Sequence, residues 1–161
     1  MGSLSLVEID SQYIKHLHKI DSRVSVKYNN RPFVGVVTIV DDITYAIPLT
    51  SQTTEERKAA GKNKRSSKVT TFVRNSNGDE IANLLYNNMV PIRDDVYNIL
   101  NIDPEEDTYE SNEIRFIRKH VDDIIDKARN VYSCRITGSD WFMNKICCDF
   151  KKLEEAMDDY T

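Results

Sequence analysis

The sequence lacks any apolar run long enough to cross a membrane, and it is poor in the residues that build small crosslinked scaffolds. Its longest apolar stretch, residues 33–40, is far short of the roughly 20 residues that a membrane-spanning helix needs. With 5 glycines and 3 cysteines in 161 residues, a collagen-like chain and a disulfide-stapled mini-domain are excluded. No basic segment followed by an apolar stretch opens the chain, so we expect a cytoplasmic protein without membrane contact.

The familiar catalytic and metal-binding patterns are also missing. The sequence contains no phosphate-binding Walker loop, no dinucleotide-binding glycine pattern and no nucleophile elbow. Cys134, Cys147 and Cys148 are odd in number, and the adjacent pair could not chelate one tetrahedral metal comfortably, so we expect reduced structural thiols. His16 and His18 stand two apart on a predicted helix and face different sides, which argues against a two-histidine mechanism. We therefore expect neither a metal nor a cofactor.

The composition is that of an ordinary globular protein, with an uneven distribution of charge. Hydrophobic residues make up 40% and charged residues 30% of the chain, a length and composition that favour one domain over residues 1–161. Residues 1–75 hold 12 lysines and arginines against 7 acidic residues, whereas residues 76–161 hold 10 against 19. Such asymmetry can confine a polyanion to one groove, although solvated acidic helix faces explain the second half equally well.

Hydrophobic patterning divides the chain into a strand-rich part followed by a helical part. Strands are predicted at residues 3–9, 33–40, 44–49, 68–74, 80–85 and 89–92. A short helix capped by Asp10 or Ser11 follows the first strand, and the turn at residues 41–42 predicts a hairpin. After Pro104, apolar residues at steps of three and four predict two long helices, separated by Gly138 and a cap at Ser139 and Asp140. The fold class is therefore α+β, with helices against a small, strongly bent antiparallel sheet or partial barrel.

The most suggestive local feature is the end of one predicted strand. Thr50 and Ser51 end the strand and open a polar, basic segment, residues 52–67, which we interpret as a flap over the site. Hydroxyls in such a place can hydrogen-bond phosphate oxygens, although a Thr-Ser pair at a strand end is more often a turn former. Six cations lie within 12 residues and form a candidate phosphate footprint: Arg57, Lys58, Lys62, Lys64, Arg65 and Lys68. A basic surface loop without a partner is the alternative interpretation.

Four local strings occur in an order that resembles the ToxN/AbiQ family of toxins. They are Ser11 to Leu17, the segment from Tyr28 to Val37, Tyr45 to Ser51 and Asn87 to Ile92. The resemblance spans nearly the whole chain, and Pro-Leu-Thr-Ser at residues 48–51 is its most specific string.

Membership of that family implies a metal-independent endoribonuclease of a type III toxin–antitoxin system, in which the antitoxin is RNA. The implied fold is a bent sheet like that of the Kid and MazF toxins, extended by helices. The implied reaction is transesterification of single-stranded RNA that leaves a 2′,3′-cyclic phosphate. The implied partners are target mRNA and a repeat-containing small RNA, which the toxin cuts into pseudoknot units and with which it forms closed or symmetric complexes.

The resemblance also assigns roles to individual residues. Thr50 and Ser51 hold the scissile phosphate, whereas Tyr13 and Tyr28 contact RNA or stabilise developing charge. In the family a lysine closely follows the Thr-Ser pair, but here residues 52–54 intervene, so Lys58 is the favoured catalytic lysine, with Lys62 and Lys64 as alternates. Arg31 replaces a family lysine and can stabilise charge but not transfer a proton. RNA contacts are expected from Tyr28, Arg31, Arg57, Lys62, Lys64, Arg65 and Lys68, and the general base is not located.

Two other functions remain open at this point. One is a MazF-like ribonuclease toxin restrained by a protein antitoxin, which would co-purify with a small protein. The other is a non-catalytic RNA-binding module, which would retard RNA without cutting it. Without the resemblance, an α+β interaction domain with no salt-dependent affinity for RNA would rank first.

Overall fold

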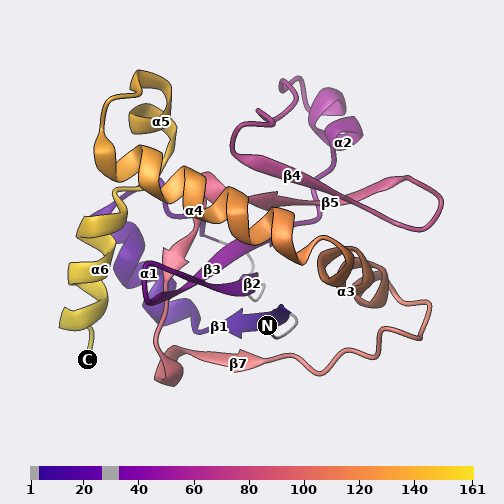
Figure 1. Ribbon diagram of the computed structural model, residues 1–161, viewed down its shortest axis with the longest axis horizontal. Helices are drawn as coiled ribbons and strands as arrows, with labels where there is room; N and C mark the ends of the chain where they lie inside the picture. The colour runs from indigo at the N-terminus through magenta and orange to yellow at the C-terminus, as the bar shows by residue number, and fades with distance from the viewer. Residues whose placement is uncertain (1–3, 27–32) are drawn as a thin grey trace.

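A seven-stranded antiparallel sheet organises the chain in the computed structural model, which describes residues 4–26 and 33–161 (Figure 1). The strand order is β4-β5-β3-β2-β1-β7, and the short β6 pairs with β3 beside β5. The strands are β1 (Ser5–Ile9), β2 (Phe33–Val40), β3 (Ile43–Thr50), β4 (Thr70–Arg74), β5 (Glu80–Leu85), β6 (Val90–Pro91) and β7 (Tyr97–Ile99). The prediction of an α+β fold with an antiparallel sheet is confirmed, and β7 is a strand that the sequence pattern did not indicate.

The sheet bends at β3 because this strand changes partners along one edge. Tyr45 and Ala46 pair with β6, whereas Leu49 and Thr50 pair with β5. The ribbon formed by β4 and β5 therefore diverges from the rest of the sheet at the end of β3, and the sheet does not close into a barrel.

Gly35 is the point where β2 approaches β3 most closely. A Cβ atom at this position would lie 2.9 Å from the backbone carbonyl oxygen of Ile47, a distance that real Cβ atoms do not adopt. Glycine is therefore required for the register in which Gly35 faces Pro48. That register in turn sets where β3 ends.

The helices pack against the sheet and against one another. They are α1 (Ser11–Ile20), α2 (Thr54–Ala59), α3 (Tyr109–Lys119), α4 (Val121–Thr137), α5 (Trp141–Ile146) and α6 (Phe150–Asp159). Figure 1 shows α4 crossing the sheet, with α1 and α6 together at one end of the molecule. Tyr13, Tyr45, Phe150 and Ile124 are among the fully buried side chains of the one core that joins the helices to the sheet. In the described ranges, no helix has the length and apolar character of a membrane span.

Each of the two long helices expected after Pro104 is interrupted. The first is divided into α3 and α4 at His120, which leaves helical geometry with φ −115° and ψ 27°. The side chain of His120, which lies within a predicted helix, stacks on Phe116 at 4.0 Å between ring centroids and is half-buried. The second is divided into α5 and α6, because the backbone N–H groups of Cys148 and Asp149 bond to other elements. Gly138, at φ 77°, ends α4 as the sequence predicted.

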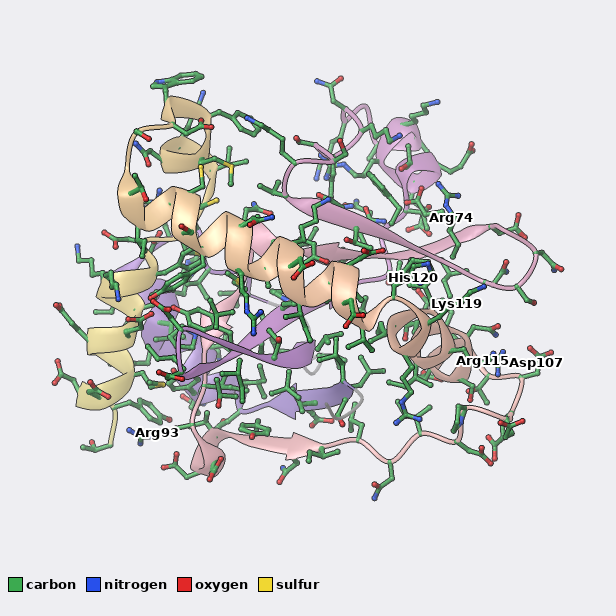
Figure 2. The ribbon with its side chains drawn as sticks, viewed as in Figure 1. Arg74, Arg93, Asp107, Arg115, Lys119 and His120 are labelled. Atoms are coloured by element: carbon green, nitrogen blue, oxygen red, sulfur yellow. The ribbon has the colours of Figure 1, made fainter. Side chains whose placement is uncertain are left out.

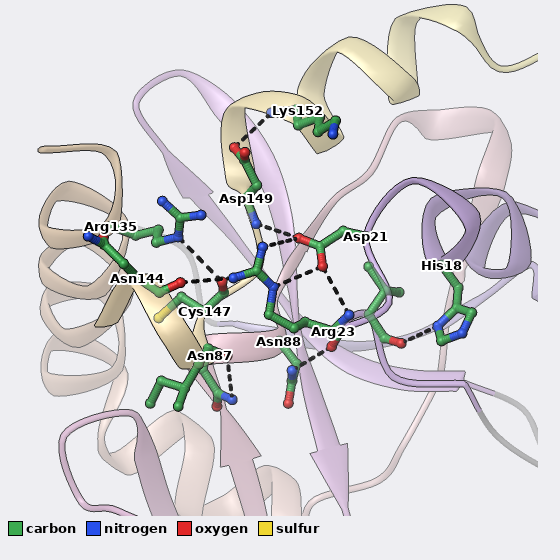
Figure 3. A network of polar contacts seen from close by, with 12 residues as sticks. His18, Asp21, Arg23, Asn87, Asn88, Arg135, Asn144, Cys147, Asp149 and Lys152 are labelled. Carbon is green, nitrogen blue, oxygen red and sulfur yellow. Dashed lines mark hydrogen bonds and ion pairs between the residues drawn. The ribbon is translucent and has the colours of Figure 1, made fainter. Parts of the chain in front are cut away.

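A polar network joins the end of α1 to the interruption between α5 and α6 (Figure 3). The carboxylate of Asp21 accepts hydrogen bonds from the Arg23 guanidinium at 2.9 and 3.0 Å and from the backbone N–H of Asp149 at 2.7 Å. Arg23 also donates to the carbonyl oxygen of Asn144 at 2.9 Å. Because Asp21 is only 7% exposed, these bonds fasten the helical layer from within.

Candidate functional site

The end of β3 presents two hydroxyl groups, of which one is free to meet a ligand. Ser51 is exposed, and no hydrogen bond joins its hydroxyl to the described residues. The hydroxyl of the half-buried Thr50 accepts a hydrogen bond from the backbone N–H of Gln52 at 3.2 Å and so shapes the turn after the strand. Thr50 retains its own hydroxyl proton as a donor.

Ser51 lies at the wall of a cleft of about 630 Å³. Leu6 of β1 and Leu49 of β3 contribute to its apolar lining, together with Leu100 and Ile102, which follow β7. The other side is formed by the first turns of α3 with Tyr109 and Glu113. The cleft therefore joins the end of β3, the edge of the sheet and α3, three segments far apart in the sequence.

The basic segment after Ser51 is clamped onto the sheet by Arg65. Its guanidinium donates to the backbone carbonyl of Gln52 at 2.8 Å, to the Gln52 side chain at 2.9 Å and to Oδ1 of Asn83 at 2.9 Å. Asn83 is fully buried in β5, opposite Thr50. Burial and the nearby Arg57 lower the pKa of Arg65 to about 10, so it remains a cation at neutral pH. The predicted flap is thus an ordered segment that Arg65 holds beside Ser51.

The helix α2 lies within this segment, where the sequence pattern indicated only a loop. Thr53 caps the helix, its hydroxyl accepting from the backbone N–H of Glu56 at 3.3 Å. Glu80 of β5 accepts the backbone N–H of Thr54 at 2.7 Å and the side-chain amide of Asn83 at 2.8 Å. Burial raises the pKa of Glu80, but these two bonds lower it more, so it lies below its ordinary value. A Thr-x-x-Glu capping pattern at residues 53–56 was the available signal for the helix.

Three lysines of the segment remain exposed and without an ion-pair partner among the described residues. Lys58 is the last cation of α2, and Lys62 follows the turn at Gly61. The ammonium of Lys64 lies over the ring of Phe72, 4.9 Å from its centroid. Arg57 is partly engaged, because its Nε donates to the carbonyl of Asn63 at 2.8 Å. These cations therefore lie on residues 52–67, the segment that directly follows Ser51 and is held in place by Arg65.

Lys68 faces a different part of the molecule. Its ammonium lies 3.4 Å from Asp140, the N-cap of α5, and 5.4 Å from the ring centroid of Phe142. It lines a separate cavity of about 450 Å³ beside α4. The structure does not bring Lys68 together with Ser51, although both belong to the basic half of the sequence.

Tyr13 is also separated from Ser51. Its side chain is fully buried, its hydroxyl donates to the carbonyl of Pro91 at 2.5 Å, and its ring packs edge-on against Tyr160. Burial raises the pKa of Tyr13, so the hydroxyl stays protonated. A side chain with no exposed surface cannot touch RNA in this conformation, and Tyr13 supports the contact between α1 and the C-terminal helix. The other two residues assigned by resemblance, Tyr28 and Arg31, lie outside the described residues.

A second group of basic side chains lies between the end of β4 and α3 (Figure 2). The cations Arg74, Arg115 and Lys119 line a cavity of about 330 Å³ together with the imidazole of His120, and no acidic residue of the described part of the chain lines it. Arg115 is held by the carbonyls of Pro104 and Glu106, whereas Lys119 is exposed. No local sequence pattern groups these residues, because they are dispersed over 47 positions and meet only when α3 packs on β4.

The arrangement suits the binding of a phosphodiester. An exposed hydroxyl at a strand end and cations on an ordered neighbouring segment can hold phosphate oxygens and stabilise extra negative charge. Among residues 4–26 and 33–161, no group of three or more His, Cys, Asp or Glu side chains is placed to hold a metal ion.

Known proteins resemble the chain over almost its full length. A family model for the toxin ToxN of type III toxin–antitoxin systems matches residues 5–158. The chain is 27% identical to the endoribonuclease ToxN of Bacillus thuringiensis subsp. kurstaki, over 94% of this chain and 81% of that relative. It is 29% identical to the endoribonuclease AbiQ of Lactococcus lactis subsp. lactis, over 94% of this chain and 86% of that relative.

Two solved structures share the fold. The structure of AbiQ, a lactococcal anti-phage endoribonuclease of a type III system, has a TM-score of 0.83 and 26% identity, covering 99% of this chain and 98% of that one. The structure of a type III toxin that a non-coding RNA pseudoknot inhibits selectively has a TM-score of 0.82 and 25% identity, with the same coverage. The bent sheet and its helices are therefore those of this group of toxins.

Proposed function

The chain belongs to the ToxN family of type III toxin–antitoxin toxins, and from that premise we propose that it cleaves single-stranded RNA at the Ser51 end of β3 without a metal ion. The protein is an endoribonuclease toxin, regulated by a non-coding RNA as its relatives are. Its substrates are cellular mRNA and the repeat-containing precursor of its antitoxin, and it acts in the cytoplasm, where both are made.

The reaction we propose is an internal transesterification. The ribose 2′-oxygen attacks the adjacent phosphorus while the bond from phosphorus to the 5′-oxygen breaks, which leaves a 2′,3′-cyclic phosphate and a 5′-hydroxyl. The proton of the 2′-hydroxyl leaves as the new bond forms, and the departing 5′-oxygen gains one. No cofactor takes part, and the phosphorane carries one more negative charge than the ground-state phosphodiester.

Several residues around β3 stabilise the additional negative charge of the phosphorane. The hydroxyls of Ser51 and Thr50 donate to the non-bridging oxygens, and Lys58 approaches from α2 as the favoured catalytic cation, with Lys62 and Lys64 as alternates. Arg65 holds residues 52–67 in position through its hydrogen bonds to Gln52 and Asn83, and its positive charge adds to the stabilisation of the phosphorane. Tyr13 acts through packing only, because its hydroxyl is bonded inside the core. Tyr28 and Arg31 remain proposed RNA contacts.

One observation carries this proposal: Ser51 is exposed at the wall of a cleft while the cationic segment beside it is held in place by Arg65. Positioned donors and positive charge are what a phosphoryl-transfer site without a nucleophilic side chain must supply. Bound units of processed antitoxin RNA would occupy the same groove and would join several toxin copies in a closed, symmetric complex.

Incubation of the purified protein with single-stranded RNA in excess EDTA tests the proposal. We expect discrete fragments with 2′,3′-cyclic phosphate ends, which become substrates for a 3′ ligation only after the cyclic phosphate is opened and removed. Fragments with 3′-hydroxyl ends, or cleavage that requires added Mg²⁺, would contradict the proposed chemistry. Intact but retarded RNA would show a binding module instead.

A further inference from the structure

The cleft beside Ser51 contains an aromatic ring and a buried carboxyl group that the cleavage chemistry does not use. Tyr109 and Glu113 stand four residues apart on α3 and therefore on the same face of the helix. Both line the cleft that Ser51 also lines.

Glu113 is a polar side chain without a partner. Its residue is only 5% exposed, and no hydrogen bond or ion pair joins its carboxyl group to the described residues. Burial and the neighbouring Glu110 raise the pKa of Glu113 to about 8. At neutral pH the group is therefore largely uncharged and offers one hydrogen-bond donor and one acceptor to whatever enters the cleft.

Tyr109 supplies an exposed ring at the start of the same helix. The residue is 43% exposed, and its hydroxyl donates to the backbone carbonyl of Ile81. That bond ties the tip of the ring to β5, so the ring is oriented without being covered. A fixed, exposed aromatic ring is the usual platform on which an unpaired base stacks.

The rest of the lining selects against a phosphate and in favour of a flat heterocycle. Glu8 and Glu110 are the other acidic residues of the cleft, and among residues 4–26 and 33–161 no lysine or arginine lines it. The floor is apolar, with Leu6, Leu49 and Leu100. An anion is disfavoured in such a place, whereas the faces of a nucleobase match the apolar floor and its edge matches a neutral carboxyl group.

We propose that this cleft is a nucleobase subsite, in which Tyr109 stacks on the base of a nucleotide next to the cleaved bond and Glu113 hydrogen-bonds the edge of that base. The proposal rests on the cleavage function assigned to Ser51. The backbone phosphate stays with the cations of residues 57–65, and the base turns away from them into the cleft. Glu113 is thus a specificity residue, because a base that leaves its buried carboxyl unpaired binds less well.

Two substitutions at Glu113 separate base recognition from other roles. E113Q keeps one donor and one acceptor on a side chain of nearly the same shape, whereas E113M keeps the shape and loses both. Neither places a new charge in the core, and E110Q changes an exposed carboxyl of the same cleft as a matched control. Thermal unfolding of each variant establishes that it folds.

The experiment measures cleavage rates on a panel of RNA oligonucleotides that differ only in the nucleotides flanking one cut, together with the affinity for the same oligonucleotides carrying a 2′-deoxy nucleotide at the cut. We expect E113Q and E110Q to keep the wild-type ranking of bases. E113M should reduce the ratio between the best and worst base by about tenfold or more in both rate and affinity. Y109A should weaken binding of every oligonucleotide.

Three results would overturn the subsite. An unchanged ranking in E113M would show that Glu113 does not meet a base. A loss of cleavage in E113Q that is equal for all sequences, with affinity unchanged, would make Glu113 a proton-transfer group. If the ranking of bases changed as much in E110Q as in E113M, the preference would depend on the overall negative charge of the cleft and not on a hydrogen bond from Glu113. If the wild-type protein cut no RNA at all, the cleavage function itself would fail, while the affinity for uncleavable RNA would still test the subsite.

Discussion

Arg23 and Arg65 are both half-buried arginines that hold a segment in place, but their surroundings differ in charge. Arg23 bonds to the carboxylate of Asp21 at 2.9 Å, and this bond raises the pKa of Arg23. Arg65 bonds only to amide and carbonyl oxygens, and burial lowers its pKa to about 10. At the junction where the end of α1 meets α5 and α6, the Asp21 carboxylate neutralises the positive charge of Arg23. Beside Ser51, the positive charge of Arg65 meets no carboxylate in a direct ion pair among the described residues and is offset only by the nearby Glu80, so it can still attract an anion.

The acidic side chains of the two regions differ in the same way. The carboxylate of Asp21 is saturated by its partners, whereas Glu113 is buried at the cleft without one. The saturated carboxylate lies where α1 meets α5 and α6, whereas the unpartnered carboxyl group lies at the cleft, so the two occupy separate regions of the molecule. Such separation is expected when the polar groups of a binding site have no partner within the protein and the ligand supplies one.

The largest effect should come from Ser51→Ala, which removes a donor from the site and leaves the junction untouched. We expect RNA cleavage to fall about 100-fold or more, with the melting temperature unchanged, because Ser51 is exposed. Ser67→Ala is the matched control, since Ser67 is exposed in the same connection but lines the other cavity. Full activity of the Ser51 variant would remove Ser51 from the site.

Asp21→Asn should weaken the contacts that join the end of α1 to α5 and α6 without changing the rate of RNA cleavage per folded molecule. It leaves the Arg23 guanidinium without its anion, and we expect a loss of about 2–3 kcal/mol in the free energy of unfolding. Burial raises the pKa of Asp21, but its bonds lower it more, so its contribution is present above pH 3.8 and is lost as pH falls below that value. Denaturant unfolding measures both effects.

Asp95→Asn is the control for this prediction, because Asp95 pairs with Arg93 at 2.6 Å but its side chain is 64% exposed. The solvent-exposed pair should contribute much less to the free energy of unfolding than the buried pair of Asp21 and Arg23. Equal losses in the two variants, or reduced cleavage per folded molecule in Asp21→Asn, would contradict the division between the two regions.

Arg65→Lys should affect both stability and activity, since Arg65 connects the cationic segment to β5. A lysine keeps the charge but cannot bridge Gln52 and Asn83 together. We expect a loss of about 1–2 kcal/mol in stability and about a fivefold to tenfold loss of cleavage as the segment shifts. An unaltered rate with reduced stability would mean that the position of the segment is unimportant for catalysis.

The titration of Glu113 should give the opposite pH dependence to that of Asp21. Because its pKa rises from 4.5 to about 8 on folding, the native state binds more protons than the unfolded state between these values. Stability should therefore decline as pH rises through this window. The groups facing it are Glu8, Tyr109, Glu110 and Ser51.

Glu113→Gln removes this titration, so its unfolding free energy should be nearly independent of pH over the same range. Chemical denaturation at several pH values checks this. A decline in the variant as steep as in the wild type would show that another group titrates.

The smallest effects should come from single lysines of the cationic segment. Lys58→Ala and Lys62→Ala should each lower the salt dependence of RNA binding by about 0.7 in the slope of log affinity against log salt. Lys68→Ala is the control, because its ammonium is paired with Asp140 at 3.4 Å and faces the other cavity. An equal change in the control would mean that the segment binds RNA only through overall charge.

Local patterns determined much of the fold. The hairpin of β2 and β3, the cap at Asp10 and the end of α4 at Gly138 follow from neighbouring residues, since turn and cap preferences act over a few positions. The placement of Ser51 at a strand end came from the same kind of signal, and the family resemblance turned it into a chemical hypothesis.

The interruption between α5 and α6 came from contacts over long distances in the chain. The amphipathic pattern continues through Cys148 and Asp149, but their backbone N–H groups find partners on Asn87 and Asp21, and the helix ends for that reason. The periodicity of a sequence shows which face is buried but not which distant carbonyl competes for a hydrogen bond.

The sequence by itself determined the fold class, the strand-end hydroxyls and the run of cations, because each depends on residues close together in the chain. Tertiary structure alone decided which of these groups share a site. It buried Tyr13, turned Lys68 toward Asp140 and brought Glu113 of α3 to the cleft of Ser51. The physical reason is that burial and charge pairing depend on packing between elements, and no local pattern records which elements meet.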